Sequence, residues 1–217
     1  MDISKARFVL LGLSVLGLGV IIGTALWMKL EPRAQFRGAQ QKPLEGLSRF
    51  GAVPEFSLVE RSGKTIRLAD LHGTIWVADF IYTTCQDTCP LQSAEMAKLQ
   101  EQWSDKPDLR LVSFSVDPAK DTPQALSRYA ERFKADKSHW LFLTGEKEPI
   151  TTLVQKGFRL SAAPAPDAAE SGVILHSPRF VLIDREAEIR GYYDSRDPQA
   201  LDRLKADVAA LLNAQKE

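Results

Sequence analysis

The fold is decided by the stretch Thr74-Ile-Trp-Val-Ala-Asp-Phe-Ile-Tyr-Thr-Thr-Cys85-Gln-Asp-Thr-Cys89-Pro90-Leu91, which contains both cysteines of the protein. Residues 75–82 are rich in β-branched and aromatic types, which predicts a buried strand. Pro90 predicts the start of a helix, because its φ angle is already helical and its missing N–H would have been unpaired there. Both sulfurs therefore lie where a strand ends and a helix begins. The positive end of the helix dipole favours thiolate, the form that binds metals and attacks disulfides.

The helix after Pro90 should bury one face, because Met96, Leu99 and Trp103 recur at helical spacing. A structural disulfide is the alternative interpretation of the cysteine pair. Two cysteines are too few for a disulfide scaffold, and the loop between them is so small that closing it removes little entropy from the unfolded chain. The pair is therefore interpreted as a chemical site.

Charge is distributed unevenly along the 217 residues, although the formal net charge is zero. Residues 1–49 carry a net charge of +4, so residues 50–217 carry −4. A mildly acidic domain gives no reason to expect nucleic acid as a partner. The length fits one domain with additional segments.

An N-terminal membrane anchor is predicted over residues 8–28, which contain no charged side chain and are long enough to span a bilayer. It follows a short tail (residues 1–7) and precedes a basic, polar linker (residues 29–49) and the main domain (residues 50–217). Gly23-Thr24-Ala25 offers a signal-peptide cleavage site, which leaves removal of the segment as an alternative. Basic residues after the anchor favour a cytoplasmic domain by the positive-inside rule, but long domains translocate largely regardless of such charge. Topology must therefore rest on other evidence.

The main domain alternates strands with helices, which predicts parallel pairing, right-handed crossovers and an α/β sandwich. Residues 161–172 lack large apolar side chains and should form an exposed loop. His72 and His139 are expected to be solvated. The predicted elements are a hairpin over 56–60 and 64–68, strands at 109–116, 140–144, 180–183 and 188–193, and helices at 123–133, 149–156 and 198–213.

Three motifs in order carry a resemblance to a known family. They are Cys85-Gln-Asp-Thr-Cys89-Pro90, then Ser115-Val-Asp-Pro followed by Asp121-Thr-Pro, and then His176-Ser before Phe180-Val-Leu-Ile-Asp. Together with the anchor they resemble the Sco/SenC family of membrane-anchored, thioredoxin-like copper chaperones for cytochrome c oxidase assembly. The resemblance implies that Cys85, Cys89 and His176 bind copper. The chain departs from the family at residues 82–84 and at residues 185–187, where a glycine is common.

The chemistry of these side chains agrees with that implication. Two thiolates and an imidazole form a soft ligand set that suits Cu(I) and can also hold Cu(II), whereas structural zinc normally has four protein ligands. A lone histidine such as His176 is by default packed or solvated, and the resemblance favours its role as a ligand. Asp87, between the cysteines, is interpreted as a loop-capping residue.

Three functional classes remain open. The first is a copper metallochaperone, which needs both cysteines and His176. The second is a thiol–disulfide oxidoreductase that reduces the cysteines of a partner's copper site. The third is a peroxidase-like or signalling domain, because fold does not determine function. The first is favoured, with a copper-site subunit of cytochrome c oxidase or another copper chaperone as partner. A monomer anchored in a bacterial inner membrane, with its main domain in the periplasm, is expected.

Overall fold

Strand β3 (Ile75–Ile81) is an interior strand of the sheet, and all seven of its residues are buried. In this computed structural model, which describes residues 47–160 and 177–214, β3 pairs in parallel with β4 (Leu109–Ser115). Strand β5 (Trp140–Thr144) pairs in parallel with β4 on its other side. The predicted parallel core of the sheet is therefore confirmed.

Antiparallel strands extend the sheet on both sides. On one side, β1 (Ser57–Glu60) pairs with β5 and forms a hairpin with β2 (Thr65–Arg67), as predicted. On the other side, β6 (Arg179–Ile183) pairs with β3, and β7 (Ile189–Asp194) pairs with β6. The strand order is β2-β1-β5-β4-β3-β6-β7.

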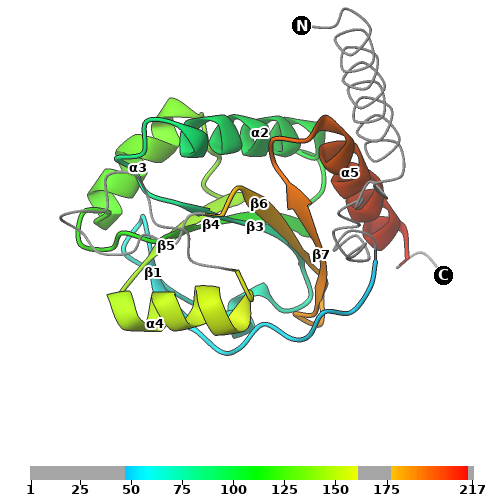
Figure 1. Ribbon diagram of the computed structural model, residues 1–217, viewed down its shortest axis with the longest axis horizontal. Helices are drawn as coiled ribbons and strands as arrows, with labels where there is room; N and C mark the ends of the chain where they lie inside the picture. Colours follow the sequence, from blue (N-terminus) through cyan, green and yellow to red (C-terminus); the bar gives the residue numbers. More distant parts are fainter. Residues whose placement is uncertain (1–46, 161–176, 215–217) are drawn as a thin grey trace, which may run out of the picture. The chain divides into compact units, whose positions relative to one another are not determined.

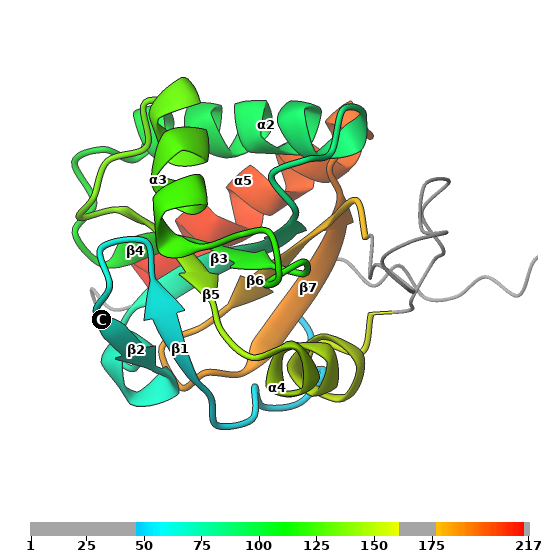
Figure 2. The same ribbon diagram turned by 90° about the vertical axis from the view of Figure 1, so that its left-hand side faces the viewer.

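Helices cover both faces of the sheet. In both views, α2 (Thr88–Gln102), α3 (Pro123–Arg132) and α5 (Pro198–Asn213) lie on one side, and α4 (Lys147–Thr152) lies on the other (Figures 1 and 2). Right-handed crossovers from β3 to β4 and from β4 to β5 place α2 and α3 on the same face. A 3-10 turn (Leu68–Leu71) precedes β3, and a π-helical turn (Leu153–Gly157) continues α4.

Two helix starts differ from the prediction. Helix α2 begins at Thr88, two residues before Pro90, and α4 begins at Lys147, two residues before Pro149. Proline is tolerated throughout the first helical turn, because none of the N–H groups there has an intrahelical partner. The shift places Cys89 inside the first turn of α2.

The alternation of side chains along β3 divides the core into two layers. Trp76 and Phe80 point towards the α4 side, where Phe80 packs against Phe114 and Phe158 with ring centroids 5.6 and 5.0 Å apart. Val77, Asp79 and Ile81 therefore face the side of α2. Asp79 pairs in register with Ser113 on β4, and this polar pair lies in an otherwise largely apolar layer.

Several predictions concern residues that the structure does not describe. The anchor over residues 8–28, the linker, the loop over residues 161–172 and His176 all lie outside the described ranges. Within those ranges, none of the helices combines the length and the apolar character that crossing a bilayer requires.

Truncation of the buried face of α2 tests this packing. Met96→Ala should lower the free energy of unfolding by about 2–5 kcal/mol, because Met96 is fully buried and its truncation leaves a cavity. Leu91→Ala is the matched control on the same helix, since Leu91 is 66% exposed, and should change that free energy by less than about 0.5 kcal/mol. Urea unfolding measures both. Equal losses in the two variants would contradict the orientation of α2.

Candidate metal and thiol site

The two cysteines lie on the short connection between β3 and α2. The Cys85 N–H donates a hydrogen bond to the Tyr82 carbonyl at 3.1 Å, which closes a tight turn after the strand. The Cys89 N–H donates to Cys85 Sγ at 3.4 Å. Both thiols are free and buried, Cys85 with 7% of its surface exposed and Cys89 with none. The predicted pair is therefore held together at one end of the sheet.

The two thiols differ in acidity. Burial raises the pKa of Cys85, but hydrogen bonds from the backbone N–H groups of Cys89 and Asp87 outweigh it, so the pKa of Cys85 lies below its ordinary value. Burial raises the pKa of Cys89 far above the ordinary value for a thiol, with the neighbouring Cys85 adding to the shift. The protein therefore favours a thiolate at Cys85 and a protonated thiol at Cys89.

A buried carboxylate fixes the loop in front of the cysteines. Asp121, which is fully buried, accepts hydrogen bonds from the Thr83 N–H at 3.1 Å and from the Thr83 hydroxyl at 2.6 Å. It also accepts one from the Ser115 hydroxyl at the end of β4, at 2.6 Å. Asp121 thus ties the cysteine loop to the neighbouring strand. The helix cap expected from the Asp121-Thr122-Pro123 motif is provided by Thr122, whose side chain accepts from the Ala125 N–H.

The strand that follows His176 starts beside the cysteine loop. The antiparallel register of β3 and β6 pairs Ala78 with Val181, so the beginning of β6 lies next to the end of β3. Gln92, one turn after Cys89 on α2, donates a hydrogen bond to the Arg179 carbonyl at 3.4 Å. Ser177, the first described residue after the gap, is buried. The described chain therefore resumes, at Ser177, at the end of the sheet where the cysteines lie.

Comparison with known proteins identifies the family. The family model described as SCO1/SenC matches residues 46–213, which is most of the chain. The chain belongs to the SCO1/SenC family.

Relatives of known name support the assignment. The chain is 30% identical over 158 residues to the SCO1 protein homolog of Bacillus subtilis (strain 168), covering 72% of this chain and 80% of that protein. It is also 30% identical over 172 residues to a putative copper-binding protein of Stutzerimonas stutzeri, with 78% and 81% covered.

Solved structures show the same thioredoxin-like fold. A SCO1/SenC family lipoprotein from Bacillus anthracis str. Ames superimposes with a TM-score of 0.67 at 34% identity, covering 79% of this chain and 98% of that one. BsSco, described as a Sco family cytochrome c oxidase assembly protein with a disulfide switch, gives a TM-score of 0.67 at 28% identity, covering 77% and 98%.

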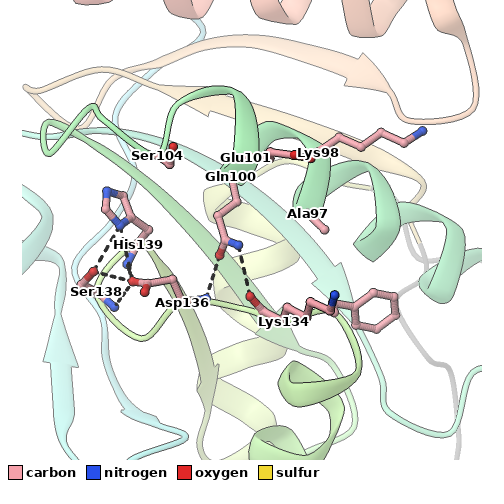
Figure 3. A pocket seen from close by; sticks show the side chains of 10 residues that line it. Ala97, Lys98, Gln100, Glu101, Ser104, Lys134, Asp136, Ser138 and His139 are labelled. Atoms are coloured by element: carbon pink, nitrogen blue, oxygen red, sulfur yellow. Dashed lines mark hydrogen bonds and ion pairs between the residues drawn. The ribbon is translucent and has the colours of Figure 1, made fainter.

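The other histidines of this SCO1/SenC protein lie away from the cysteines. His72 is exposed, as predicted. His139 lies at the surface with its side chain 24% exposed, and it lines a hollow of about 550 Å³ beside Asp136 and Ser138 (Figure 3). His139 precedes β5, at the end of the parallel sheet opposite Cys85. Within residues 47–160 and 177–214, no three His, Cys, Asp or Glu side chains are grouped to hold a metal.

Sequence reasoning missed a second carboxylate near the thiols. Asp79 is fully buried on the α2 side of β3, and burial raises its pKa to about 7, an effect that the nearby Ser113 hydroxyl only partly offsets. Its charge also contributes to the raised pKa of Cys89. The available signal was an acidic residue within the otherwise apolar run of residues 75–81, since such a residue is rarely buried without a role.

The buried carboxyl of Asp79 should make stability depend on pH. An unfolded aspartate ionises near pH 3.9, so below that pH both states hold the proton. Between about pH 4 and pH 7 only the unfolded state loses it, so the free energy of unfolding falls with rising pH and then levels off. Asp79→Asn removes this pH-dependent fall in the free energy of unfolding. The melting temperature of the variant should therefore rise above that of the wild type across this window and stay higher at pH 8. Calorimetry of both proteins measures the difference, in which other titrating groups cancel. A difference in melting temperature between the two proteins that stays constant from pH 4 to pH 8 would contradict a buried, neutral carboxyl.

Proposed function

We propose that this SCO1/SenC protein is a copper-binding assembly factor for a respiratory cytochrome c oxidase, with one copper held by Cys85, Cys89 and His176. The observation that carries the proposal is the pair of free cysteines that follows β3, in which the Cys89 N–H donates a hydrogen bond to Cys85 Sγ. Support comes from the relative named as a putative copper-binding protein and from BsSco, described as an oxidase assembly protein.

The chemistry of the two sulfurs suits a soft metal ion. Cys85 already favours the thiolate, and Cys89 releases its proton when the metal binds, so copper uptake is accompanied by proton release. His176 would supply a neutral imidazole as third ligand. This role for His176 is supported by its place in the sequence directly before Ser177, because the chain enters β6 there, beside the cysteine end of the sheet.

Thiol–disulfide exchange is a second candidate function, which the unequal acidity of the thiols favours. The Cys85 thiolate would attack a partner's disulfide, forming a mixed disulfide and releasing one partner thiolate. Cys89, after losing its proton to solvent, would attack Cys85 Sγ, close the Cys85–Cys89 bond and release the second partner thiolate. Two electrons pass from the cysteine pair to the partner.

The partner and the cellular location form part of the same proposal. The client is a cytochrome c oxidase subunit carrying a copper site, or another copper chaperone that exchanges copper with this one. Residues 8–28 anchor a monomer in a bacterial inner membrane, with residues 50–217 on the periplasmic face. The apolar length of residues 8–28 supports the anchor.

Copper titration tests the ligand set. The reduced full-length protein should bind one copper per chain, and Cys85→Ser or Cys89→Ser should abolish tight binding, because each removes one of two soft ligands. Oxidation to the Cys85–Cys89 disulfide should do the same, since it consumes both thiolates. Ser93→Ala, which alters α2 without removing a sulfur, is the control and should bind copper normally. An unchanged copper stoichiometry in the oxidised protein would refute a dithiolate site.

A reporter fusion tests the topology. Alkaline phosphatase fused after Glu217 should be active, because it folds only where its disulfides can form, outside the cytoplasm. A matched fusion to a reporter that works only in the cytoplasm should be inactive. The opposite pair of results would mean that the basic residues after the anchor hold the domain inside the cell.

A further inference from the structure

Tyr192 lies on β7, an edge strand of the sheet, and its buried hydroxyl has no hydrogen-bond partner. The residue is 6% exposed, and its ring packs edge-on against that of Phe50 with centroids 5.4 Å apart. A tyrosine hydroxyl usually finds a partner when it is buried, and leaving it unpaired costs free energy. The Tyr192 hydroxyl therefore calls for a partner from outside the described residues.

Arg179, at the start of β6, lies on the same face of the sheet as Tyr192. Tyr192 pairs with Val181 in the antiparallel register of β6 and β7, and residues two apart on a strand share a face. Arg179 is therefore a diagonal neighbour of Tyr192, within reach of a long side chain. Arg179 is exposed. Its cross-strand partner Asp194 is already held by Arg196, through hydrogen bonds of 2.9 and 2.7 Å.

Arg159 approaches the same place from the chain that follows α4. Its φ of 53° is a left-handed backbone conformation that is uncommon outside glycine. A Cβ atom at Gly51 would lie 2.9 Å from Arg159 Nη2, so the guanidinium packs directly on this glycine, next to Phe50. Phe50 in turn contacts the Tyr192 ring. None of the carboxylates in residues 47–160 and 177–214 forms an ion pair with Arg159 or Arg179.

Arg159, Arg179 and Tyr192 form an arginine–tyrosine cluster whose polar groups are all hydrogen-bond donors towards an anion. Burial raises the pKa of Tyr192, and the positive charges of the two arginines partly offset this rise, as expected for guanidinium groups near the phenol. A planar guanidinium matches the paired oxygens of a carboxylate or a phosphate. The cluster therefore combines positive charge with an unused buried donor.

The cluster lies at the end of the sheet where the cysteines are. The Arg179 carbonyl accepts a hydrogen bond from Gln92 Nε2 at 3.4 Å, and Gln92 is one turn after Cys89 on α2. A protein that docks on the cysteines therefore has the cluster within reach of its own side chains.

We propose that the arginine–tyrosine cluster is a binding site for an oxyanion, either a carboxylate or a phosphate. The two guanidinium groups supply charge and paired donors, and the Tyr192 hydroxyl supplies the third donor. The oxyanion comes from an acidic side chain of the protein that engages the cysteines, or it is free phosphate. The first source rests on the proposed function, whereas oxyanion binding itself requires neither copper nor the thiols.

A titration followed through the arginine Nε–H signals in nuclear magnetic resonance spectra measures binding to the full-length protein in detergent micelles. Three probes are compared at constant ionic strength: inorganic phosphate, N-acetylglutamate amide, which presents one side-chain carboxylate, and N-acetylglutamine amide, its uncharged counterpart. The signals of Arg159 and Arg179 should shift saturably with an anionic probe and stay unchanged with the uncharged one. Tighter binding of the glutamate probe assigns the site to an acidic side chain, and tighter binding of phosphate assigns it to free phosphate.

Tyr192→Phe should weaken binding of the tighter probe at least about fivefold, because it removes only the hydroxyl donor. Arg159→Gln and Arg179→Gln should each weaken it at least about tenfold, because hydrogen bonds between charged groups are the stronger ones, and the remaining arginine reports the binding. Arg128→Gln is the matched control, since Arg128 is an exposed arginine of α3, which covers the opposite face of the sheet from α4 (Figure 2). It should bind the probe as the wild type does.

The inference would be overturned by a lack of saturable shifts with both anionic probes, by equal shifts with the uncharged probe, or by wild-type affinity in Tyr192→Phe. A loss in Arg128→Gln equal to that in the cluster variants would overturn it as well. Copper titration of the same proteins keeps the two proposals apart. Tyr192→Phe should bind copper as the wild type does, because it retains all three proposed ligands. A wild type that binds the oxyanion but no copper would refute the proposed function and leave the cluster as the oxyanion site.

Discussion

The burial of β3 on both faces is the constraint on which the site depends. Helices cover the sheet on both sides, so the seven residues of this strand lie out of contact with water. The chain can present reactive side chains to a partner only where the strand leaves the sheet. Helix α2 begins within seven residues of that point, so the connection is short and the two sulfurs have little freedom. A preorganised pair of this kind loses little entropy when it binds a metal or forms a disulfide.

Two buried carboxylates adjust this site in different ways. Asp121 accepts three hydrogen bonds and holds the loop in front of Cys85 against the end of β4, so its contribution is geometric. The buried carboxyl of Asp79 instead acts through its charge, which adds to the raised pKa of Cys89. The same low dielectric that makes a buried carboxyl costly lets its charge act on the Cys89 thiol. Geometry and charge at the site are therefore controlled by separate residues, and substitutions can separate them.

Local patterns were sufficient to predict much of the fold. Strand β3 followed from its apolar run, and α5 followed from its amphipathic period and from Pro198. The start of α2 was misplaced because Pro90 can occupy any position in a first turn. The roles of Asp79 and Asp121 depend on which strands become neighbours, information that no local pattern contains. The hollow beside His139 could not be predicted for the same reason, because it is formed by α2 and by the chain between α3 and β5. The cysteine pair was found because its residue types and its strand–helix context coincide in one short stretch.

The proposed copper site consists of the sulfurs of Cys85 and Cys89 and the imidazole of His176. X-ray absorption at the copper edge, on the copper-loaded full-length protein and on its His176→Ala variant, tests it most directly. The wild type should show scattering from two sulfurs and one histidine nitrogen, and the variant should lose the histidine contribution while both sulfurs are retained. A histidine signal that persists in His176→Ala, or a copper ion bound by fewer than two sulfurs in the wild type, would contradict it.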